Sequence, residues 1–415
     1  MARKKISEVF TPRRSDINEK MYVGRPSLEK SLLRAIEGSQ HVLLCGESGN
    51  GKTWLYRKVL HGNYYYIAAN CANASHCSSI TREIEQISFN DGDSKKISYV
   101  ESKGAGLKAF VADANVSHTG SYELRQQDPL LEALKNISKR SPTESSIIVL
   151  ENLESIFNSP ELMDELARII LLLDDPRYAA TKVKFLIVGT PTGVIEYFSK
   201  TKNLDSVSNR ISELPKVGGL SDKEVKQLVT KGFVHELSIN ISENEIVFLA
   251  DHIFNVTMGV AQRVHEYCEQ LAFQIEDNDW NYNKDLIKNA DWAWLTGGLR
   301  QSYAVLEGKL NSRDTSVARR NQAIFSIGKI RVHQFDTAII EAHIRREFPE
   351  TVKGKNLGIS TILTELTAEP DPLLIRNQKT GQYRVKDPRY VMCIRTALFK
   401  DVHSGKVRKR NFIAG

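Results

Sequence analysis

Residues 46–53 have the types and the spacing of a loop that binds phosphate. Their sequence, Gly-Glu-Ser-Gly-Asn-Gly-Lys-Thr, fits the pattern G-x-x-x-x-G-K-[ST]. In such a loop, glycines let backbone N–H groups point at a β-phosphate, the lysine places a charge near the β- and γ-phosphates, and the threonine hydroxyl ligates Mg²⁺. The pattern therefore predicts binding of ATP with Mg²⁺. The residues predicted to contact the nucleotide are Gly46, Glu47, Ser48, Gly49, Asn50, Gly51, Lys52, Thr53 and Trp54.

The sequence on both sides of the loop supports this interpretation. Residues 41–45 form an apolar run that predicts a strand, and residues 53–60 can form a helix. The N-terminus of that helix would carry roughly +0.5 charge toward the nucleotide. The alternative is a glycine-rich turn that binds nothing, and the coincidence of strand, complete motif and helix disfavours it.

A second group of polar residues follows the apolar residues 146–150. Glu151 ends this predicted strand, at the edge of a parallel sheet where α/β proteins bind ligands, and there it would be the acid that serves Mg²⁺. The next residue is Asn152, whose amide can hydrogen-bond a water molecule but cannot take its proton. Either Glu154 reaches the site from the following turn, or ATP hydrolysis is slow.

Three further residues are candidates for contact with the γ-phosphate. Thr190 follows another apolar strand and would sense the phosphate or hold the attacking water, unless it belongs to a plain turn. Arg210 precedes a predicted edge strand at residues 211–217. It could act as a finger on a neighbouring subunit, which implies a homo-oligomer, or it could form a surface salt bridge. Arg263 lies near the start of a helix predicted to open at residues 258–264, from which a helical lid could aim it at the phosphates.

Length and composition are those of a soluble globular protein with two or three domains. The chain has 415 residues, of which 41% are hydrophobic and 26% charged. No stretch approaches the ~18 apolar residues of a membrane span, and the basic N-terminus lacks the apolar segment of a secretory signal. The five cysteines are scattered, which favours a reducing, cytoplasmic compartment. Cys71 and Cys77 beside His76 have no second ligand pair, so we do not expect a zinc site.

The segments between these motifs predict an α/β fold with a parallel sheet flanked by helices. Residues 26–36 have helical spacing, and residues 64–70 predict a strand. Residues 88–127 are polar and rich in glycine and serine. We expect them to be an insertion with a hairpin at residues 107–124, because so long a structureless loop is uncommon inside a domain.

The C-terminal region has a pattern of its own. Helical spacing from residues 323, 335 and 359 predicts three helices, and residues 373–386 then alternate as a β-hairpin. Residues 376–415 carry 11 Lys or Arg against two Asp, a local charge of +9, so the rest of the +7 chain is at −2. This positive charge predicts contact with duplex DNA. Because the third helix is nearly uncharged, we expect contact with the DNA backbone rather than with the bases. A solvated tail without a partner, or packing of the module against protein, are the alternatives.

The order of these motifs resembles that of AAA+ ATPases of the origin-recognition and STAND-like group. It runs from a Val-Gly-Arg box at residues 23–25 through the phosphate loop, the Glu-ended strand, the Gly-Thr-Pro strand end and the Asn-Arg-Ile segment to a Gly-x-x-x-Arg helix. Three helices followed by a hairpin also resemble a winged-helix domain. The resemblance implies an adenine site at Tyr22, Val23 and Arg25, a Mg²⁺ acid at Glu151, sensor 1 at Thr190, a trans arginine finger at Arg210 and sensor 2 at Arg263.

The expected domains are a basic N-terminal arm (1–20), an AAA+ core (21–218), a helical lid with linker helices (219–312), a winged-helix domain (313–402) and a basic tail (403–415). Two functional classes fit. The first is an ATP-controlled switch that couples nucleotide state to oligomerisation and DNA binding, which the basic end favours. The second is a signalling or anti-phage defence ATPase that gates a partner effector protein, with the winged helix as a docking or autoinhibitory module. Asn152 and the insertion favour the second class. A nucleotide-binding scaffold without turnover is a third possibility.

Overall fold

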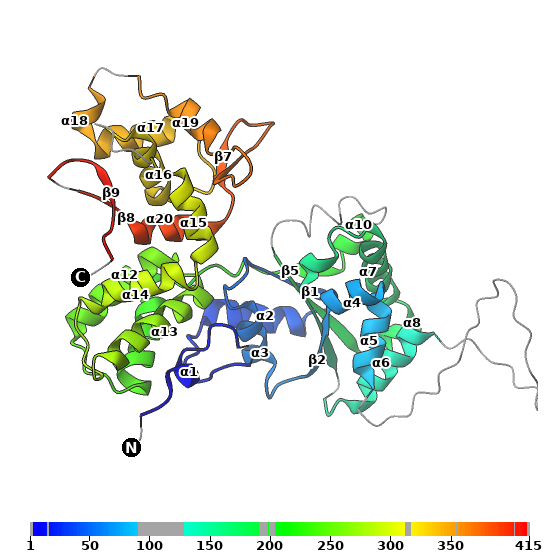
Figure 1. The fold of residues 1–415 in the computed structure, drawn as a ribbon. Coiled ribbons are helices and arrows are strands. Elements are labelled where there is room, and N and C mark those ends of the chain that lie inside the picture. Colours follow the sequence, from blue (N-terminus) through cyan, green and yellow to red (C-terminus); the bar gives the residue numbers. More distant parts are fainter. Residues whose placement is uncertain are drawn as a thin grey trace, which may run out of the picture. The chain divides into compact units, whose positions relative to one another are not determined.

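The structure is a computed structural model that describes residues 3–14, 16–89, 128–143, 145–190, 198, 204–311, 317–353, 356–401 and 403–412 (Figure 1). The chain forms two compact units. The sheet unit contains residues 25–48 and 55–217, and the helical unit contains residues 1–24, 49–54 and 218–415. The expected insertion lies outside the described residues from residue 90 onward, and so does its predicted hairpin.

A five-stranded parallel sheet forms the centre of the sheet unit, with the strand order β2-β3-β4-β1-β5. The strands are β1 (His41–Cys45), β2 (Tyr65–Asn70), β3 (Ser146–Glu151), β4 (Val183–Gly189) and β5 (Ile211–Glu213). Neighbouring side chains of a strand point to opposite faces, so Leu43 packs into one core while Val42 and Leu44 pack into the other. The near-continuous apolar runs are therefore explained by a sheet that is covered on both faces.

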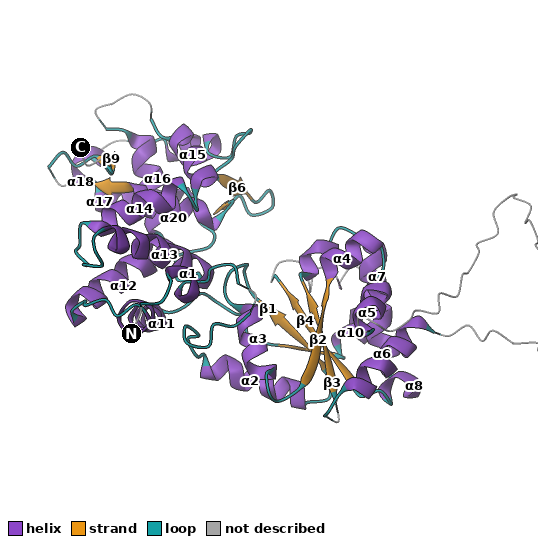
Figure 2. Ribbon diagram, turned by 60° about the horizontal axis from the view of Figure 1, so that its bottom comes forward, coloured by secondary structure: helices purple, strands orange, loops and turns teal. Residues whose placement is uncertain are grey.

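Helices cover the two faces of this sheet, as Figure 2 shows. One face packs against α2 (Pro26–Glu37) and α3 (Lys52–Leu60). The other packs against α4 (Cys71–Cys77), α5 (Ile80–Ser88), α6 (Pro129–Arg140), α7 (Pro160–Leu172) and α8 (Pro176–Ala179), with α10 (Leu204–Ser208) and a short 3₁₀ helix, Leu153–Ile156. The predicted helix at 26–36 and the predicted strands at 41–45, 64–70 and 146–151 are confirmed within one residue. The edge strand predicted to reach Val217 ends at Glu213, and Val217 forms only an isolated bridge with Gly46.

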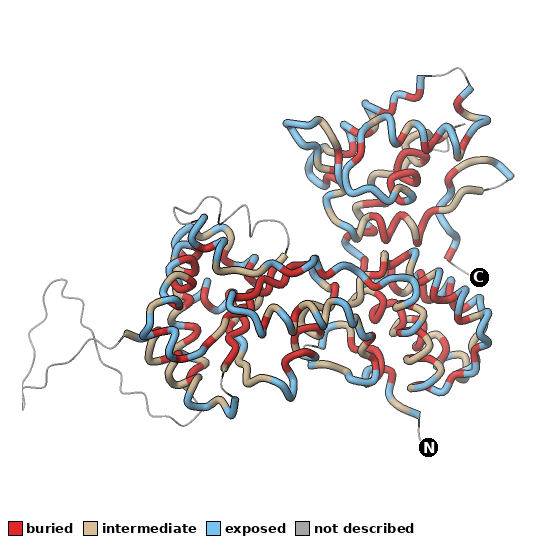
Figure 3. Tube along the Cα trace, turned by 180° about the vertical axis from the view of Figure 1, so that it is seen from behind, coloured by how far each residue is buried: buried red, intermediate tan, exposed pale blue. Residues whose placement is uncertain are grey.

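The first part of the helical unit is a helix bundle. Its helices are α1 (Ile6–Val9), α11 (Asp222–Val229), which continues as a π-helical segment (Thr230–Glu236), α12 (Glu243–Thr257), α13 (Ala261–Asp277), α14 (Leu286–Thr296) and α15 (Arg300–Lys309). Two of them begin with the sequence Ser-x-x-Glu, and in both the serine and glutamate form a capping box, Ser221 with Glu224 and Ser242 with Glu245. Buried positions, red in Figure 3, recur along these helices as their apolar spacing requires.

The N-terminal segment is part of this bundle's core. Within the predicted basic arm at residues 1–20, Ile6, Val9 and Phe10 are buried, and Phe10 packs against Phe233 with ring centroids 5.0 Å apart. The apolar residues of so short a helix have no visible periodicity, which explains why the sequence does not reveal it.

The second part of the helical unit contains the predicted C-terminal elements. These are α16 (Arg319–Lys329), α17 (Thr337–Glu347), α18 (Pro349–Val352), α19 (Ile359–Glu365), β6 (Leu374–Arg376), β7 (Tyr383–Val385), α20 (Pro388–Ala397), β8 (Leu398–Lys400) and β9 (Val407–Lys409). The three helices and the antiparallel β6–β7 hairpin appear where expected. Within the predicted basic tail at residues 403–415, β9 pairs with β8 and Phe412 is buried.

Candidate functional site

The carboxyl ends of three adjacent strands carry the candidate residues of the sheet unit. Gly46 follows β1, Glu151 ends β3, and Thr190 follows β4, which lies between the other two. Cys45 pairs with Gly189, and the Gly46 N–H donates to the Gly189 carbonyl at 3.2 Å. Thr190 therefore lies beside the start of the phosphate loop, at the sheet edge where ligands of α/β proteins bind.

The carboxylate of Glu151 is held by a buried phenol. Tyr56 of α3 is fully buried, and its hydroxyl donates to Glu151 Oε1 at 2.8 Å. Burial and the negative charge of Glu151 raise the pKa of Tyr56, so the phenol stays protonated and donates. The Tyr56 hydroxyl thereby helps to fix the orientation of the Glu151 carboxylate.

Asn152 has a left-handed backbone, with φ at 56°. Asparagine tolerates this conformation better than glutamate does, which gives a structural reason for the residue at this position. Its Nδ2 donates to Oδ1 of Asn70 at 3.0 Å, and the same oxygen accepts from the Ala72 amide at the start of α4. The Asn152 amide is thus tied to the neighbouring strand end.

The phosphate loop uses the glycines for their backbone conformation. Gly49 and Gly51 have φ of 83° and 85°, a region that other residues rarely adopt. Lys52 and Thr53 are the first residues of α3, where the orphan N–H groups of a helix favour an anion. The Gln262 amide at the start of α13 donates to the Gly49 carbonyl at 2.9 Å. The loop thus depends on glycine at two positions, and α13 contacts it directly.

A buried histidine joins the end of the loop to the N-terminal segment. The Thr11 amide donates to Nδ1 of His265 at 3.3 Å, and the ring of Trp54 meets His265 edge-on at 5.4 Å. Trp54 Nε1 donates to the Arg14 carbonyl at 3.0 Å. Burial lowers the pKa of His265 to about 4, and only the neutral imidazole can accept from Thr11.

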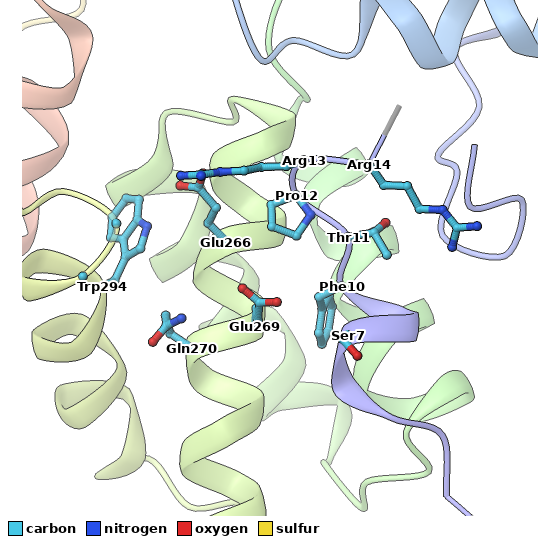
Figure 4. Close-up of a pocket in the computed structure, with 12 residues that line it drawn as sticks. Ser7, Phe10, Thr11, Pro12, Arg13, Arg14, Glu266, Glu269, Gln270 and Trp294 are labelled. Carbon is cyan, nitrogen blue, oxygen red and sulfur yellow. The ribbon is translucent and has the colours of Figure 1, made fainter. Parts of the chain in front are cut away.

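Arg263, the predicted lid cation, is paired within its own helix. Its Nη1 lies 2.5 Å from Oε2 of Glu266, whose other oxygen accepts from the Gln262 side chain at 3.1 Å. Beside this pair is a cavity of about 580 Å³ between α13, the N-terminal segment and the end of α14. Figure 4 shows Arg13 extending across this cavity toward Glu266, with Glu269 pointing into it. The charges in this region are therefore mixed, and Arg263 is not a free cation.

The residues predicted to line the adenine site are divided between the units. The Tyr22 carbonyl accepts from Lys231 Nζ at 2.5 Å, and Val23 is buried in the core of the helical unit. Arg25 belongs to the sheet unit, where its backbone N–H donates to Glu29 at 2.7 Å.

The remaining candidates lie on the surface of the sheet unit. Arg210 pairs with Asp174 at 2.5 Å and donates to the Ser206 carbonyl, so it forms the surface salt bridge that was its alternative interpretation. Glu154 is exposed on the 3₁₀ helix that follows Asn152, and Glu47 pairs with Lys216 at 3.0 Å.

The side chains of Thr53 and Glu151 are suited to a Mg²⁺ ion that is bound together with a nucleotide. No cluster of three or more His, Cys, Asp or Glu side chains occurs in the described ranges, so a cage made by protein alone is absent there. Mg²⁺ bound to ATP takes most of its ligands from phosphate and water. Thr53 and Tyr56 are three residues apart on α3 and share a face, and Tyr56 contacts Glu151. A hydroxyl and a carboxylate have the hard oxygen chemistry that Mg²⁺ prefers.

Sequence reasoning missed Tyr56, Asn70 and His265. All three lie in elements that were predicted, but their types are those of ordinary core or cap residues. The one available signal was spacing, because Tyr56 follows Thr53 by one helical turn. None of the helices in the described part of the chain is both long and apolar enough to cross a membrane.

Comparison with known proteins gives the following matches. Residues 34–198 match the model of an AAA domain family. A Walker-type ATPase of Pyrococcus abyssi has a similar structure, with a TM-score of 0.52 and 13% identity, over 92% of this chain and 99% of that one. The ORC2 protein of Aeropyrum pernix gives 0.48 and 13% over 94% and 98%, and Cdc6p of Pyrobaculum aerophilum gives 0.47 and 13% over 94% and 97%. No protein with a curated description matches the sequence. At these identities, the first structure shows a shared fold.

Proposed function

We propose that this chain, whose residues 34–198 match the AAA domain family, is an ATP-binding AAA+ ATPase whose nucleotide state controls its binding to a partner macromolecule. The observation that carries the proposal is the phosphate loop. Two glycines with positive φ lead from β1 into Lys52 and Thr53 at the start of α3, beside a sheet edge that carries Glu151. A loop without a ligand would have no need of this combination.

We propose the following roles for individual residues in binding ATP and Mg²⁺. Loop N–H groups and Lys52 bind the β- and γ-phosphates, and Thr53 with Glu151 holds Mg²⁺, which supplies positive charge to the phosphates. Tyr56 orients Glu151. Thr190 lies beside the loop start and is placed to contact the γ-phosphate or a water. Tyr22, Val23 and Arg25 remain our proposal for the adenine site, and Arg263 for a lid cation once Glu266 releases it.

ATP turnover is proposed to be slow, because Asn152 cannot take a proton from water. Replacing Asn152 with Glu should raise the rate only modestly. A glutamate there would adopt the left-handed backbone at a cost of about 1 kcal/mol and would face the Asn70 oxygen that already caps α4. The trans-finger proposal for Arg210 requires that a neighbouring subunit draw it away from Asp174.

Lys52→Ala tests the nucleotide-binding proposal. Removing a charge-assisted contact to phosphate should weaken ATP affinity by roughly 10- to 100-fold, measured by titration of a fluorescent ATP analogue. Lys58→Ala, an exposed lysine of the same helix, is the matched control and should bind as the wild type does. Equal affinity of Lys52→Ala and the control would exclude the loop as the site.

We propose that the β6–β7 hairpin contacts the backbone of duplex DNA as the wing of a winged helix. Its cations are exposed, namely Arg376, Lys379, Arg384 and Lys386. The basic residues at the chain end are less available, because Arg408 pairs with Asp401 and Lys409 with Glu307. These ion pairs are our reason for proposing the hairpin, rather than the chain end, as the main contact.

Salt dependence of DNA binding tests this contact. If each wing cation neutralises one phosphate, log K should fall against log salt with a slope of about −3.6, and the double variant Arg384→Ala/Lys386→Ala should reduce the slope by about two. Arg408→Ala is the comparison and should leave the slope unchanged, whereas a phosphate contact by Arg408 would reduce it by about 0.9. An absence of duplex binding at ~50 mM salt, with or without ATP, would reject the DNA proposal.

The second candidate function is the gating of a partner protein. Asn152 favours it, because a switch that hydrolyses ATP slowly holds its ATP-bound state for long periods. Tight DNA binding by the wing would support the first candidate. Nucleotide-dependent binding of a protein segment without DNA binding would support the second.

A further inference from the structure

A groove of about 900 Å³ crosses the helical unit between α12 and the segment that connects α16 to α17. We call it the α12–α16 groove. Residues that line it include Phe254, Met258, Lys329, Arg331, Val332 and Arg395. It is separate from the phosphate loop and the β6–β7 hairpin tip, and its volume is within the range of about 300–1,000 Å³ of specific ligand sites.

One end of the groove has positive charge without acidic partners. Arg395 donates to the Gly328 carbonyl at 2.6 Å and to the Asn255 carbonyl at 3.0 Å, so it binds both walls but no carboxylate. Lys329 and Arg331 are exposed beside it, and none of the described carboxylates forms an ion pair with either. This end of the groove therefore favours an anion.

The rest of the groove favours a ligand with apolar side chains. Phe254 and Met258 of α12 are half-buried, and Val332, which also lines the groove, is 50% exposed. The opposite end carries Asp222 and Asp251. These carboxylates would repel a continuous phosphate backbone, which also has no apolar side chains to offer. Charge and apolarity together therefore favour a protein segment over nucleic acid.

The floor of the groove is connected to the phosphate loop through a rigid turn. Met258 and Gly259 both have positive φ, and a side chain at Gly259 would lie 2.1 Å from the Leu220 carbonyl oxygen. The chain then enters α13, where the Gln262 amide donates to Gly49 of the phosphate loop. A ligand that moves Met258 would thus act on a segment that contacts the nucleotide-binding loop within four residues.

We propose that the α12–α16 groove docks a segment of a partner protein in which acidic residues stand next to apolar ones. The acidic side chains bind Lys329, Arg331 and Arg395, and the apolar ones pack on Phe254, Met258 and Val332. The coupling of this site to nucleotide rests on the proposed function, whereas docking itself does not. If the protein gates a partner, as in the second candidate function, this proposal specifies the chemistry of the partner's docking segment.

The test uses the full chain and a random peptide library displayed on phage, first without nucleotide. We expect selected peptides to be enriched in Asp and Glu beside Leu, Phe or Met. In fluorescence anisotropy, a selected peptide should bind roughly tenfold or more weakly to the double variant Lys329→Glu/Arg331→Glu. Val332→Asp, a second exposed site, should also weaken binding. Lys288→Glu, an exposed lysine on α14, is the control and should bind normally.

Three results would overturn the proposal: no enriched peptide, enrichment of basic peptides, or equal binding to wild type and both groove variants. Displacement of the peptide by a short DNA duplex, with loss of duplex binding in Lys329→Glu/Arg331→Glu, would assign the groove to nucleic acid instead. Repeating the titration with ATP and with ADP then tests coupling. If the peptide binds with the same affinity in all nucleotide states, the proposed coupling to nucleotide is rejected, whereas the docking site stands.

Discussion

At the scale of single residues, the candidate site depends on the hydrogen bond between a phenol and a carboxylate. Glu151 is only partly buried, and a carboxylate at a strand end has several rotamers available. Tyr56 selects one of them from a position where it contacts no ligand itself. We therefore regard Tyr56 as a positioning residue.

Replacing Tyr56 with Phe should keep the fold and weaken the use of Mg²⁺. The ring still fills its place, but loss of a hydrogen bond to a charged group costs about 1.5–3 kcal/mol. We expect a higher Mg²⁺ requirement for nucleotide binding, with little change in binding of nucleotide without metal. Mg²⁺ titrations of Tyr56→Phe check this, and Tyr66→Phe, whose ring meets Tyr56 edge-on at 6.2 Å, is the control. An unchanged Mg²⁺ requirement would leave Tyr56 as a packing residue only.

At the scale of elements, a carboxylate from α7 caps the N-terminus of α5. Glu165 accepts from the backbone amides of Ile80 and Thr81 and from the Ser79 hydroxyl, each at 2.9 Å. Burial alone would raise the pKa of Glu165, but these hydrogen bonds outweigh it and the pKa is lowered. The contact joins two helices that cover the same face of the sheet.

Glu165→Gln should destabilise the sheet unit by about 1–3 kcal/mol, because two amide donors lose a charged acceptor. Since the folded pKa lies below the unfolded value, the stabilisation is complete above about pH 4.3 and is lost as pH falls through the folded pKa. Urea unfolding of Glu165→Gln and wild type should therefore converge in acid. The neighbouring, exposed Asp164→Asn is the control. A difference that persists undiminished in acid would contradict this account.

The elements show which features the sequence reveals and which it does not. Strands β1, β3 and β4 are apolar runs with defined ends, so periodicity and composition predict them. Helix α1 has four residues, and Phe10, which follows it, contacts the rings of Phe233 and His265 far along the chain, so no local pattern marks this segment. In the same way, Lys52 is identified by its motif, whereas the roles of Tyr56 and Asn70 arise only when distant strand ends meet.

At the scale of the whole helical unit, the end of the chain folds back onto the bundle. Phe412 stacks on Trp292 of α14 with ring centroids 5.3 Å apart, and Lys409 pairs with Glu307 of α15 at 2.5 Å. The Arg410 amide donates to the Ala397 carbonyl at 2.7 Å. These contacts fasten the last hairpin to helices of the bundle.

Phe412→Ala should therefore destabilise the helical unit by about 3 kcal/mol, the cost of removing a buried aromatic side chain. Trp292 would become more exposed, and its fluorescence should shift to the red. Thermal unfolding and fluorescence spectra measure the two effects, with the exposed Asn411→Ala as control. Wild-type stability in Phe412→Ala would show that the C-terminal residues are dispensable for the fold.

The burial of α1 has a consequence for synthesis of the protein. The Thr11 amide bonds a histidine 254 positions later, and Phe10 packs on residues of the same distant bundle. At about 5–20 residues per second, the ribosome needs roughly 10–50 s to supply that partner. During this time Ile6, Val9 and Phe10 have no core to enter, while the sheet unit can already fold. Residues 6–11 are thus among the last of the helical unit to pack, and until then their apolar side chains are open to a chaperone.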